Sequence, residues 1–270
     1  MSTYETITYA TPEPHVALLT LNRPDRLNAY TDELTWETQD AIQRFQTDDD
    51  ARVLIVTGEG RGFCAGGDIG ASSDSAARAH VKERQLGHAR QMIEGMQAVV
   101  LALTRLDKPS IAMVNGPAVA GGLALALGCD FRIAGSEARL GDTSGKIGLL
   151  PDEGGAWLFP QAMGLDRALK MTLLHEVYDA ETAFRLGLVT EVVPQAALRD
   201  HTMEFARALA ERAPLAVRLA KQMMRRASDL TLEQSMIDAA LSVMITNDSA
   251  DVQEGKAAFF AKRKPEFQGR

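Results

Sequence analysis

The sequence predicts an α/β protein whose core alternates strands with helices and continues into a helical C-terminal region. Short apolar runs that end at glycine, proline or asparagine are typical of buried strands. Stretches with helical periodicity lie between these runs, and this alternation indicates an α/β core. Beyond Val193 nearly every stretch has the helical pattern. The 270 residues show no internal repeat and no shift in composition. We therefore expect a core over residues 1–193 and a helical region over residues 194–270.

Strands are predicted at three segments, namely residues 15–21, where the residues alternate enough for a strand, residues 53–57 and Ser110–Val114. The second segment is a continuous apolar run, which is the pattern of a strand covered on both faces. Asn22-Arg23-Pro24 ends the first strand, and Asn115-Gly116-Pro117 ends the third. A glycine-rich loop over residues 58–68 follows the second strand.

Helices are predicted where apolar residues recur every three or four positions: the segment after Thr31, the stripe from Met92 to Leu103, and residues 198–213, 215–227, 232–245 and 252–262. Thr31 and Ser249 are expected to cap the first and last of these helices. Asp32 and Glu33 follow Thr31, where acidic side chains complement the helix dipole. The stripe from Met92 to Leu103 is interpreted as part of the core.

The pair Gly121-Gly122 opens a short apolar helix over residues 123–127, directly after the third strand and its turn. Glycine has no Cβ, so another molecule can approach its backbone closely. The free N–H groups of a helix N-terminus and the positive end of its dipole stabilise a developing negative charge. The glycines by themselves leave two interpretations open: an oxyanion hole, or tight packing of the helix against a strand.

Composition and charge exclude several classes of function. Hydrophobic residues make up 46% of the chain and charged residues 24%, which is ordinary for a globular protein. A net charge of -7 argues against nucleic acid as a partner bound through a broadly basic surface. No apolar run approaches the roughly 20 residues that span a bilayer, and the N-terminus lacks a secretory signal pattern, so no membrane partner is expected. Cys64 and Cys129 form no C-x-x-C motif, which leaves a cytoplasmic location as the expectation.

Other catalytic and metal-binding motifs do not fit the sequence. Residues 141–147 differ from a phosphate-binding loop, because the spacing is one residue short and no hydroxyl residue follows Lys146. Ser144 lies outside any G-x-S-x-G motif. No metal site is expected, because metal-ligand spacing is absent from the five histidines His15, His80, His88, His175 and His201.

Several motifs in a fixed order resemble the crotonase superfamily of enoyl-CoA hydratases and isomerases. They run almost from end to end: Asn22-Arg23-Pro24, Leu27-Asn28-Ala29, FCAGGDI at 63–69, Lys108-Pro109, VNGPAVAGG at 114–122, Ala183-x-x-Leu186-Gly187-Leu188-Val189 and FFAKR at 259–263. Each motif is modest alone, but together in this order they are highly specific. The resemblance implies a spiral of repeated ββα turns over residues 1–193. It also implies that residues 194–270 join subunits into a homo-oligomer, a trimer or a dimer of trimers, and close the CoA site.

The resemblance also assigns an oxyanion hole. By match to the family's motifs, the backbone N–H groups of Ala65 and Gly121 would bind the thioester oxygen of an acyl-CoA substrate. Removal of a proton from Cα creates an enolate whose charge lies on that oxygen. Each aimed donor lowers the barrier by roughly 3 kcal/mol in comparable oxyanion holes. The resemblance therefore favours the oxyanion interpretation of Gly121, and packing remains an explanation for Gly122. Coenzyme A is part of the substrate, and no separate cofactor is expected.

Contacts with the substrate are implied at a further set of positions: Arg26, the backbone of Ala65, Gly66, Gly67, Asp68 and Ile69, then Gly121, Ser144, Phe259 and Lys262. The last two match residues that often reach the nucleotide from an adjacent subunit. For Arg26, Phe259 and Lys262, a solvated charge or a packed ring is the alternative explanation. The width of the acyl pocket is expected to depend on residues 71–80 and the helix after them.

The resemblance favours an isomerase over a hydratase. Hydratases of the family hold a water between two glutamates, and the matching positions here are Ala124 and Ser144. Neither side chain accepts a proton at neutral pH, so efficient hydration requires another acid/base, either Asp142 or Glu153. Asp152 matches the acid of relatives that shift a double bond, in a segment similar to the ring-epoxide isomerases of phenylacetate breakdown and the Δ3,Δ2-enoyl-CoA isomerases. We therefore expect Asp152 to take a proton from Cα and return it at Cγ.

Several alternatives stay open. Asp152 could simply cap the helix that begins near Gly154. Dehalogenating relatives use an acid at this position as a nucleophile, but they also need a histidine near the place where this chain has Gln97. A hydratase (lyase) or hydrolase on the same scaffold remains a second enzymatic interpretation. A non-catalytic protein that binds acyl-CoA or acts as a scaffold is the interpretation from another class.

Overall fold

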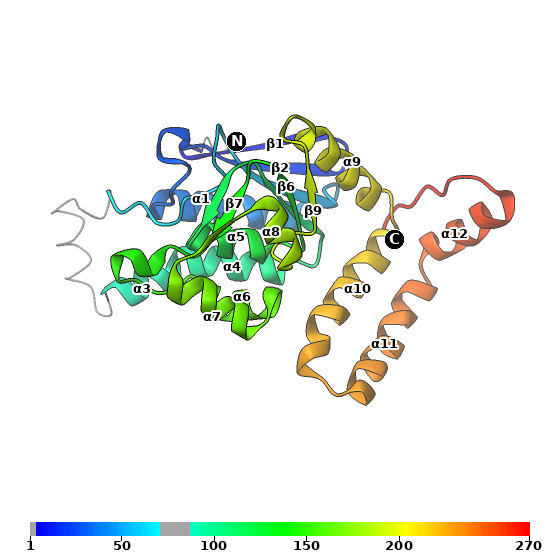
Figure 1. The fold of residues 1–270 in the computed structure, drawn as a ribbon. Helices are drawn as coiled ribbons and strands as arrows, with labels where there is room; N and C mark the ends of the chain where they lie inside the picture. The colour runs from blue at the N-terminus through cyan, green and yellow to red at the C-terminus, as the bar shows by residue number, and fades with distance from the viewer. Residues whose placement is uncertain (1–3, 71–86) are drawn as a thin grey trace.

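The computed structural model of the chain describes residues 4–70 and 87–270. Within these residues the central element is a six-stranded sheet in the order β1-β2-β3-β4-β6-β9 (Figure 1). Its strands are β1 (Ile7–Glu13), β2 (Val16–Leu21), β3 (Val53–Gly58), β4 (Ser110–Val114), β6 (Phe131–Gly135) and β9 (Glu191–Val193). β1 and β2 are antiparallel, and the later neighbours in the sheet are parallel.

A second, three-stranded sheet has the order β5-β7-β8. It consists of β5 (Pro117–Val119), β7 (Arg139–Gly141) and β8 (Val177–Asp179). Twice in succession the chain places one strand in each sheet and then forms a helix: β4, β5 and α5 (Gly121–Gly128), followed by β6, β7 and α6 (Gly155–Met163). Parallel neighbours in one sheet require crossover connections of this kind. The predicted α/β class with repeated ββα turns is confirmed.

The other α-helices are α1 (Asp32–Thr47), α3 (Gly87–Glu94), α4 (Met96–Arg105), α7 (Leu165–Leu174), α8 (Ala180–Arg185), α9 (Leu198–Ala210), α10 (Pro214–Arg226), α11 (Leu232–Asn247) and α12 (Ala250–Ala261). Short 3₁₀ helices are η1 (Pro24–Arg26), η3 (Ser144–Ile147), η4 (Gln195–Ala197) and η5 (Ala227–Asp229). Both predicted caps are confirmed. The Thr31 side chain accepts from the Leu34 N–H, and the Ser249 side chain accepts from the Val252 N–H, each at 3.3 Å.

The central strands are covered on both faces. Leu18 of β2 packs in a cluster with Met203 of α9, whereas its neighbour Leu19 packs with Phe45 of α1 and Leu103 of α4. Successive residues of a strand point to opposite faces of a sheet, so adjacent leucines enter different clusters. Burial on both faces is the reason that β2, β3 and β4 have continuous apolar runs rather than alternating ones.

Two elements differ from the sequence prediction. The stripe from Met92 to Leu103 is not one helix, because the chain bends at Gly95, with φ −97° and ψ −114°, between α3 and α4. Leu103 is buried as predicted, but Ile93 is 56% exposed. The sequence does not predict the strand β1 over Ile7–Glu13, because only Ile7 in it is buried. This strand forms through its pairing with β2.

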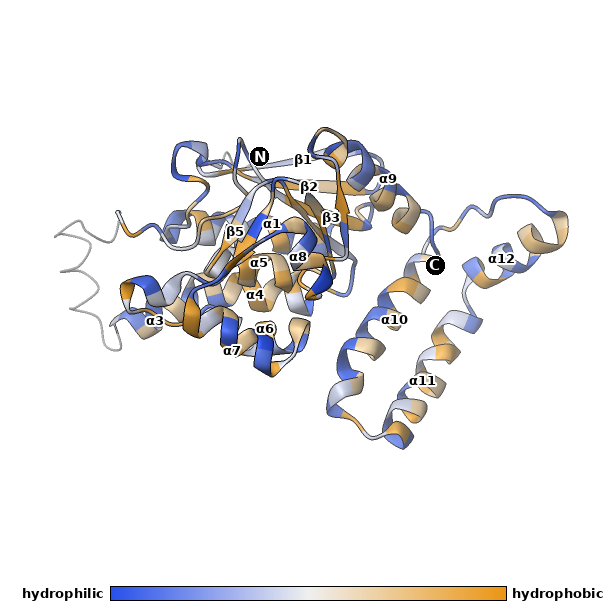
Figure 2. Cartoon of the chain, viewed as in Figure 1, coloured by the Kyte–Doolittle hydropathy of each residue, from blue (hydrophilic) through white to orange (hydrophobic). Residues whose placement is uncertain are grey.

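The C-terminal helices divide into two parts. α9 covers one face of the six-stranded sheet. α10 contacts the body of the molecule, because Arg218 pairs with Asp107 and Lys221 pairs with Asp130. α11 and α12 lie farther out, with α10 and α11 side by side (Figure 1). α11 has no buried residue, and apolar residues lie along it (Figure 2). No helix in the described part of the chain combines the length and apolarity needed to cross a bilayer.

Candidate active site

Two glycine-containing loops meet beside the second sheet. The loop after β3 lies along β5, because the Cys64 N–H donates to the Pro117 carbonyl oxygen at 3.0 Å. A Cβ added at Gly66 would lie 3.7 Å from the Gly121 nitrogen. The backbone segments that contain Ala65 and Gly121 are therefore neighbours in space.

Gly121 is the first residue of α5, where an N–H group has no partner inside the helix. Every residue of α5 is buried, so the positive end of the helix acts in a medium of low dielectric constant. Ala120, directly before Gly121, has φ 51° and ψ −125°, which is a strained conformation for a residue with a Cβ. This end of α5 is suited to stabilising a negative charge.

The two glycines at the start of α5 have different surroundings. A Cβ on Gly122 would lie 2.0 Å from the Cys64 carbonyl oxygen, so the close contact of two backbones requires glycine there. A Cβ on Gly121 would lie 2.6 Å from Oε1 of Glu153 and 2.7 Å from Cε1 of Tyr30. Tight packing therefore accounts for Gly122, whereas Gly121 borders polar side chains.

The Ala65 N–H group has a partner inside the protein. It donates to the carbonyl oxygen of Leu27 at 3.0 Å. A thioester oxygen at this place therefore has to compete with Leu27 for the donor. The sequence does not indicate this bond, because Leu27 belongs to a separate motif far earlier in the chain.

Glu153 is the acidic side chain that packs against Gly121. It is 5% exposed, and its Oε1 accepts a hydrogen bond of 2.6 Å from the Tyr30 hydroxyl. Its other oxygen, Oε2, is buried without a hydrogen-bond partner among the described residues. Tyr30 is absent from the site predicted by sequence. Its position directly after the Leu27-Asn28-Ala29 motif could have indicated that Tyr30 belongs to the site. The sequence does not indicate that its hydroxyl pairs with Glu153.

Asp152 lies beside Glu153 in the same loop and is partly buried. Its carboxylate makes no hydrogen bond or ion pair with any described residue, whereas its carbonyl oxygen accepts from Nε2 of Gln97 at 2.7 Å. α6 has Gly154 as its N-cap, without a side-chain cap bond, so Asp152 does not cap that helix. The backbone of Asp152 is held in place while its carboxylate stays available.

The positions that match the two hydratase glutamates carry no acid/base. Ala124 is fully buried inside α5, and the Ser144 side chain is buried in η3. Asp142 is also fully buried, and its Oδ1 accepts from the Ser144 N–H at 3.0 Å. Its Oδ2 has no hydrogen-bond partner in the described chain. Asp142 therefore shapes the turn that leads into η3, and one of its oxygens stays unpartnered.

Burial changes the proton affinity of several groups in this region. It raises the pKa of Glu153, and the nearby charges of Asp152 and Asp142 act in the same direction, whereas the Tyr30 hydrogen bond acts against them. Burial, together with Glu153, also raises the pKa of Tyr30 far above its usual range. The buried thiol of Cys64 has its pKa raised to about 12. Pairs of carboxyl groups in unlike environments are typical of sites that perform acid and base chemistry.

The residues expected to bind CoA fall into two groups. Arg26 is exposed and approaches the loop after β3, since a Cβ on Gly70 would lie 3.8 Å from its Nη1. Asp68 of that loop forms a 2.7 Å ion pair with Arg23, and Ile69 is 62% exposed. Arg26 is therefore near the loop of residues 65–69. Residues 71–80, expected to set the pocket width, lie outside the described residues.

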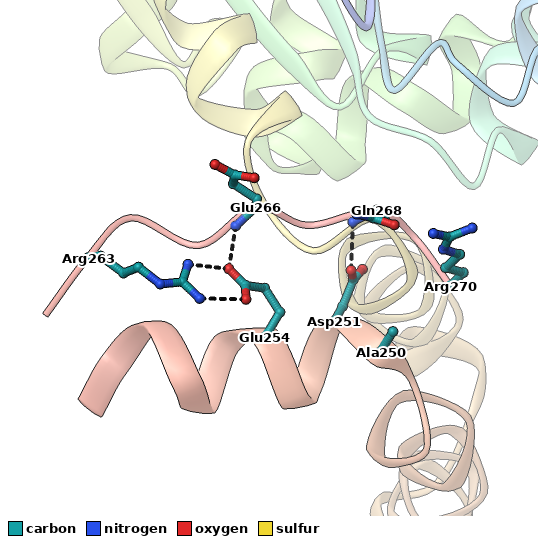
Figure 3. Close-up of a pocket in the computed structure, with 7 residues that line it drawn as sticks. All are labelled: Ala250, Asp251, Glu254, Arg263, Glu266, Gln268 and Arg270. Atoms are coloured by element: carbon teal, nitrogen blue, oxygen red, sulfur yellow. Dashed lines mark hydrogen bonds and ion pairs between the residues drawn. The ribbon is translucent and has the colours of Figure 1, made fainter. Parts of the chain in front are cut away.

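The second group lies on α12, well away from α5 (Figure 1). Phe259 is 79% exposed, and Lys262 ends the helix with φ 52°. α12 borders a hollow of about 410 Å³ lined by Ala250, Asp251, Glu254, Arg263, Glu266, Gln268 and Arg270 (Figure 3). In this hollow Glu254 pairs with Arg263 at 2.5 Å and accepts from the Glu266 N–H at 2.8 Å. These contacts fix the C-terminal segment on α12.

No cluster of three metal-ligating side chains occurs within residues 4–70 and 87–270. Two of the histidines in this part of the chain have ordinary structural partners. His201 lies 2.6 Å from a carboxylate oxygen of Glu191, and Nδ1 of His15 lies 2.7 Å from the Asp50 carbonyl oxygen.

Comparison with known proteins gives a consistent assignment. Residues 12–270 match the family model of enoyl-CoA hydratase/isomerase. The chain is 37% identical over 258 residues to 1,2-epoxyphenylacetyl-CoA isomerase of Escherichia coli K12, covering 96% of this chain and 97% of that protein. It is 36% identical over 259 residues to (E)-benzylidenesuccinyl-CoA hydratase of Thauera aromatica, covering 94% and 96%. The crystal structure of an enoyl-CoA hydratase from Bacillus anthracis superimposes with a TM-score of 0.92 at 30% identity, covering 98% of this chain and 100% of that one.

The relatives therefore include both isomerases and hydratases, and all of those named act on acyl-CoA compounds. The fold, the order of motifs and the length of the match agree with one another. This chain belongs to the enoyl-CoA hydratase/isomerase family, and it is an enzyme of the crotonase type.

Proposed function

We propose that the protein is an enoyl-CoA isomerase that moves a double bond of an acyl-CoA thioester from the 3 position to the 2 position. One observation carries the proposal. The Asp152 carboxylate has no partner among the described residues, and it lies in the loop whose Glu153 packs against Gly121, while both hydratase glutamate positions hold Ala124 and Ser144. The name of the Escherichia coli relative, an isomerase, supports this choice over hydration.

The thioester oxygen binds at the start of α5 in this proposal. The Gly121 N–H is one donor, and the Ala65 N–H becomes the second when the substrate displaces or shares its bond to Leu27. Loss of a proton from Cα moves negative charge onto the thioester oxygen, where these donors hold it. A preorganised donor of this kind contributes about 3 kcal/mol to transition-state stabilisation.

Asp152 is the acid/base of the proposed reaction. Its carboxylate removes a proton from Cα, and the electron pair of that C–H bond enters the dienolate. The same proton is then returned to Cγ, which leaves the double bond conjugated with the thioester. One C–H bond is broken at Cα and one is formed at Cγ, so the proposed step uses no cofactor. The hydrogen bond from Gln97 to the Asp152 carbonyl oxygen ties this loop to α4.

Hydration is the second candidate, and Glu153 is the observation that favours it. Glu153 is buried against Gly121 and has an oxygen without a partner in the described chain. A water molecule between Glu153 and Asp152 would have two carboxyl groups to orient and activate it. The Thauera aromatica relative is named a hydratase. The isomerase is preferred because the Tyr30 hydroxyl already donates to Glu153, whereas the Asp152 carboxylate has no hydrogen-bond partner within residues 4–70 and 87–270.

The proposal includes a homo-oligomer, as a trimer or a dimer of trimers. α11 has no buried residue, and α12 lies well away from α5 in one chain (Figure 1). A second copy that packs against the projecting helices would bury the apolar residues of α11. It would also place α12 where its basic and aromatic residues can reach CoA bound to a neighbour.

Two substrates test the function directly. Purified protein is incubated with a 3-enoyl-CoA and, separately, with a 2-enoyl-CoA, and conjugation and hydration are followed by absorbance and product analysis. We expect conjugation of the first and little water addition to the second. Asp152→Ala is expected to lower kcat for isomerisation by about 10²–10⁴-fold. Asp166→Ala, which removes an exposed acid from the start of α7, is the matched control. Rapid hydration that persists in Asp152→Ala would contradict the proposal.

A further inference from the structure

Tyr30 connects the parts of the candidate site to one another. Its N–H donates to the Gly66 carbonyl oxygen at 2.9 Å, and its carbonyl oxygen accepts from the Asp68 N–H at 3.0 Å. Its ring borders Gly121, where an added Cβ would lie 2.7 Å from Cε1. Its hydroxyl donates to Oε1 of Glu153 at 2.6 Å. One residue therefore links the loop after β3, through its backbone, to the start of α5 and the acidic loop before α6, through its side chain.

Glu153 has one satisfied oxygen and one unsatisfied oxygen. Tyr30 is the donor to Oε1, whereas Oε2 is buried with no partner among the described residues. A buried carboxylate oxygen without a donor is costly, but a protonated carboxyl group supplies a donor of its own. Because the Tyr30 hydroxyl already occupies Oε1, the proton of a neutral Glu153 belongs on Oε2.

The groups that face Glu153 favour its neutral form. Asp152 from the same loop and Asp142 from the loop after β7 are both acidic, and the Cys64 thiol approaches from the loop after β3. Burial is the largest cause of the raised pKa of Glu153, and the two aspartates add to it. The Tyr30 hydrogen bond is the opposing influence, because it stabilises the ionised form.

We propose that Tyr30 is a positioning residue that holds the Glu153 side chain at Gly121, where its buried and acidic surroundings keep it a neutral carboxylic acid, and that the O–H of Glu153 donates a hydrogen bond to the enolate oxygen. This inference rests on the proposed function and adds a donor to it. The Ala65 N–H is engaged by Leu27, so a further donor near Gly121 has a clear use. A neutral carboxyl group in an apolar site can stabilise an enolate in this way.

The proton of Glu153 stays on Glu153 throughout the proposed reaction. Asp152 alone accepts the proton from Cα and returns it at Cγ, so no bond of Glu153 is formed or broken. The role therefore differs from general acid catalysis, and substitutions can tell the two apart. An amide side chain can replace a hydrogen-bond donor, but it cannot replace a group that transfers a proton.

The first test compares Glu153→Gln with Glu153→Ala. Glutamine keeps the shape and a donor N–H, and we expect kcat within about tenfold of the wild-type value. Alanine removes the donor, and we expect a loss of about 10²-fold in kcat. Ionisation of Glu153 is expected to lower the wild-type rate at alkaline pH, and the glutamine variant is expected to lack this fall. A glutamine variant as inactive as the alanine variant would overturn the inference in favour of proton transfer.

The second test removes the Tyr30 hydroxyl and keeps the ring, as Tyr30→Phe. The matched control is Tyr178→Phe, because the Tyr178 hydroxyl on β8 also donates to a glutamate, Glu176, at 2.6 Å. We expect Tyr30→Phe to lower kcat by about tenfold and to leave KM within about twofold. The alkaline fall in rate is expected to move to higher pH, because the lost hydrogen bond had lowered the pKa of Glu153. An unchanged pH profile would show a merely structural role and overturn the inference.

Two readouts separate this inference from the proposed function. The first is exchange of the Cα hydrogens of a saturated acyl-CoA with D₂O, which requires the enolate but no double-bond shift. The second is the infrared carbonyl band of a protonated carboxyl group, expected in the wild type and absent from Glu153→Gln. If the Cα hydrogens exchange and the Glu153 carbonyl band is present, but no isomerisation occurs, the proposed function is overturned and the inference is supported. Isomerisation without a Glu153 band would support the function and overturn the inference.

Discussion

The side-chain amide of Gln97 donates a 2.7 Å hydrogen bond to the carbonyl oxygen of Asp152. Gln97 lies on α4, and Asp152 lies in the loop before α6, so the bond ties that loop to a packed helix. The contact uses the backbone of Asp152 and leaves its carboxylate without a described partner. Gln97 therefore positions the proposed acid/base without neutralising it.

We predict that Gln97→Ala lowers kcat for isomerisation by roughly tenfold, because a displacement of about 1 Å in a catalytic group is enough to slow a reaction strongly. KM is expected to change little. Gln39→Ala is the matched control, since Nε2 of Gln39 also donates to a backbone carbonyl, that of Glu94, at 3.0 Å. Steady-state kinetics of both variants check the prediction. Equal rates for the two variants would show that Gln97 does not position the site.

The two glycines at the start of α5 are expected to respond differently to alanine. Gly122→Ala drives a Cβ to 2.0 Å from the Cys64 carbonyl oxygen, and we expect it to destabilise the fold by about 1–3 kcal/mol or more. Gly121→Ala meets the side chains of Glu153 and Tyr30 instead, and we expect it to abolish most activity with a smaller effect on stability. Thermal unfolding and kinetics on both variants separate the effects. A Gly121→Ala variant with wild-type kcat would contradict this assignment.

Glu153→Gln is expected to stabilise the protein at neutral pH. The pKa of Glu153 is raised above the value of 4.5 for an unperturbed glutamate, so the folded state holds this proton more tightly than the unfolded state does. Below pH 4.5 both states are protonated and the variant has no advantage. The wild type loses stability relative to the variant as pH rises from there to the folded-state pKa. Each unit between the two pKa values corresponds to about 1.4 kcal/mol, or about 3–6 °C in Tm.

Glu254→Gln is the control of opposite sign for that measurement. Hydrogen bonds from Arg263, then from the Glu266 N–H, lower the pKa of Glu254 to about 2. Its contribution to stability is present above pH 4.5 and is lost as pH falls toward 2. This variant is therefore expected to lower Tm at neutral pH and to lose its effect in acid. Tm measured for both variants across pH 3–8 checks the two signs together, and a common sign would contradict the assignment of Glu153.

Both cysteines are expected to be unreactive in the native protein. Burial raises the pKa of Cys64 and of Cys129 to about 12, and the thiolate is the reactive form. A thiol reagent at pH 8 should label neither residue until the protein is unfolded, when both should react. Rapid labelling of native protein would show that the loop after β3 opens on the timescale of the measurement.

A homo-oligomer is predicted from the exposed apolar residues of α11, among them Met236 at 64% and Leu241 at 62% exposure. Light scattering is expected to give three or six times the chain mass of 29.2 kDa. Leu241→Glu should lower the measured mass, because it places a charge in the buried interface. Glu233→Lys changes charge at the start of the same helix and is the control. A wild-type protein that elutes as a monomer would contradict the prediction.

The sequence by itself determined the elements whose pattern is local. Apolar runs located β3 and β4, because strands buried on both faces have no polar alternation, and partial alternation located β2. Thr31 and Ser249 marked helix starts, because a capping side chain acts on a backbone group only three positions away. Gly121-Gly122 identified the start of α5, and several short motifs in a fixed order identified the family, since each of these signals depends on residues adjacent in the chain.

The tertiary structure decided what depends on distant pairs. Tyr30 and Glu153 are 123 positions apart, and no periodicity or motif spacing relates a hydroxyl to a carboxyl over that distance. The bond from Ala65 to Leu27, the strand β1 paired with β2, and the break at Gly95 likewise depend on neighbours that only the fold supplies. Glu153 and Asp152 are adjacent acids that the sequence cannot distinguish. The fold buries Glu153 and leaves Asp152 partly exposed, and burial raises the pKa of Glu153.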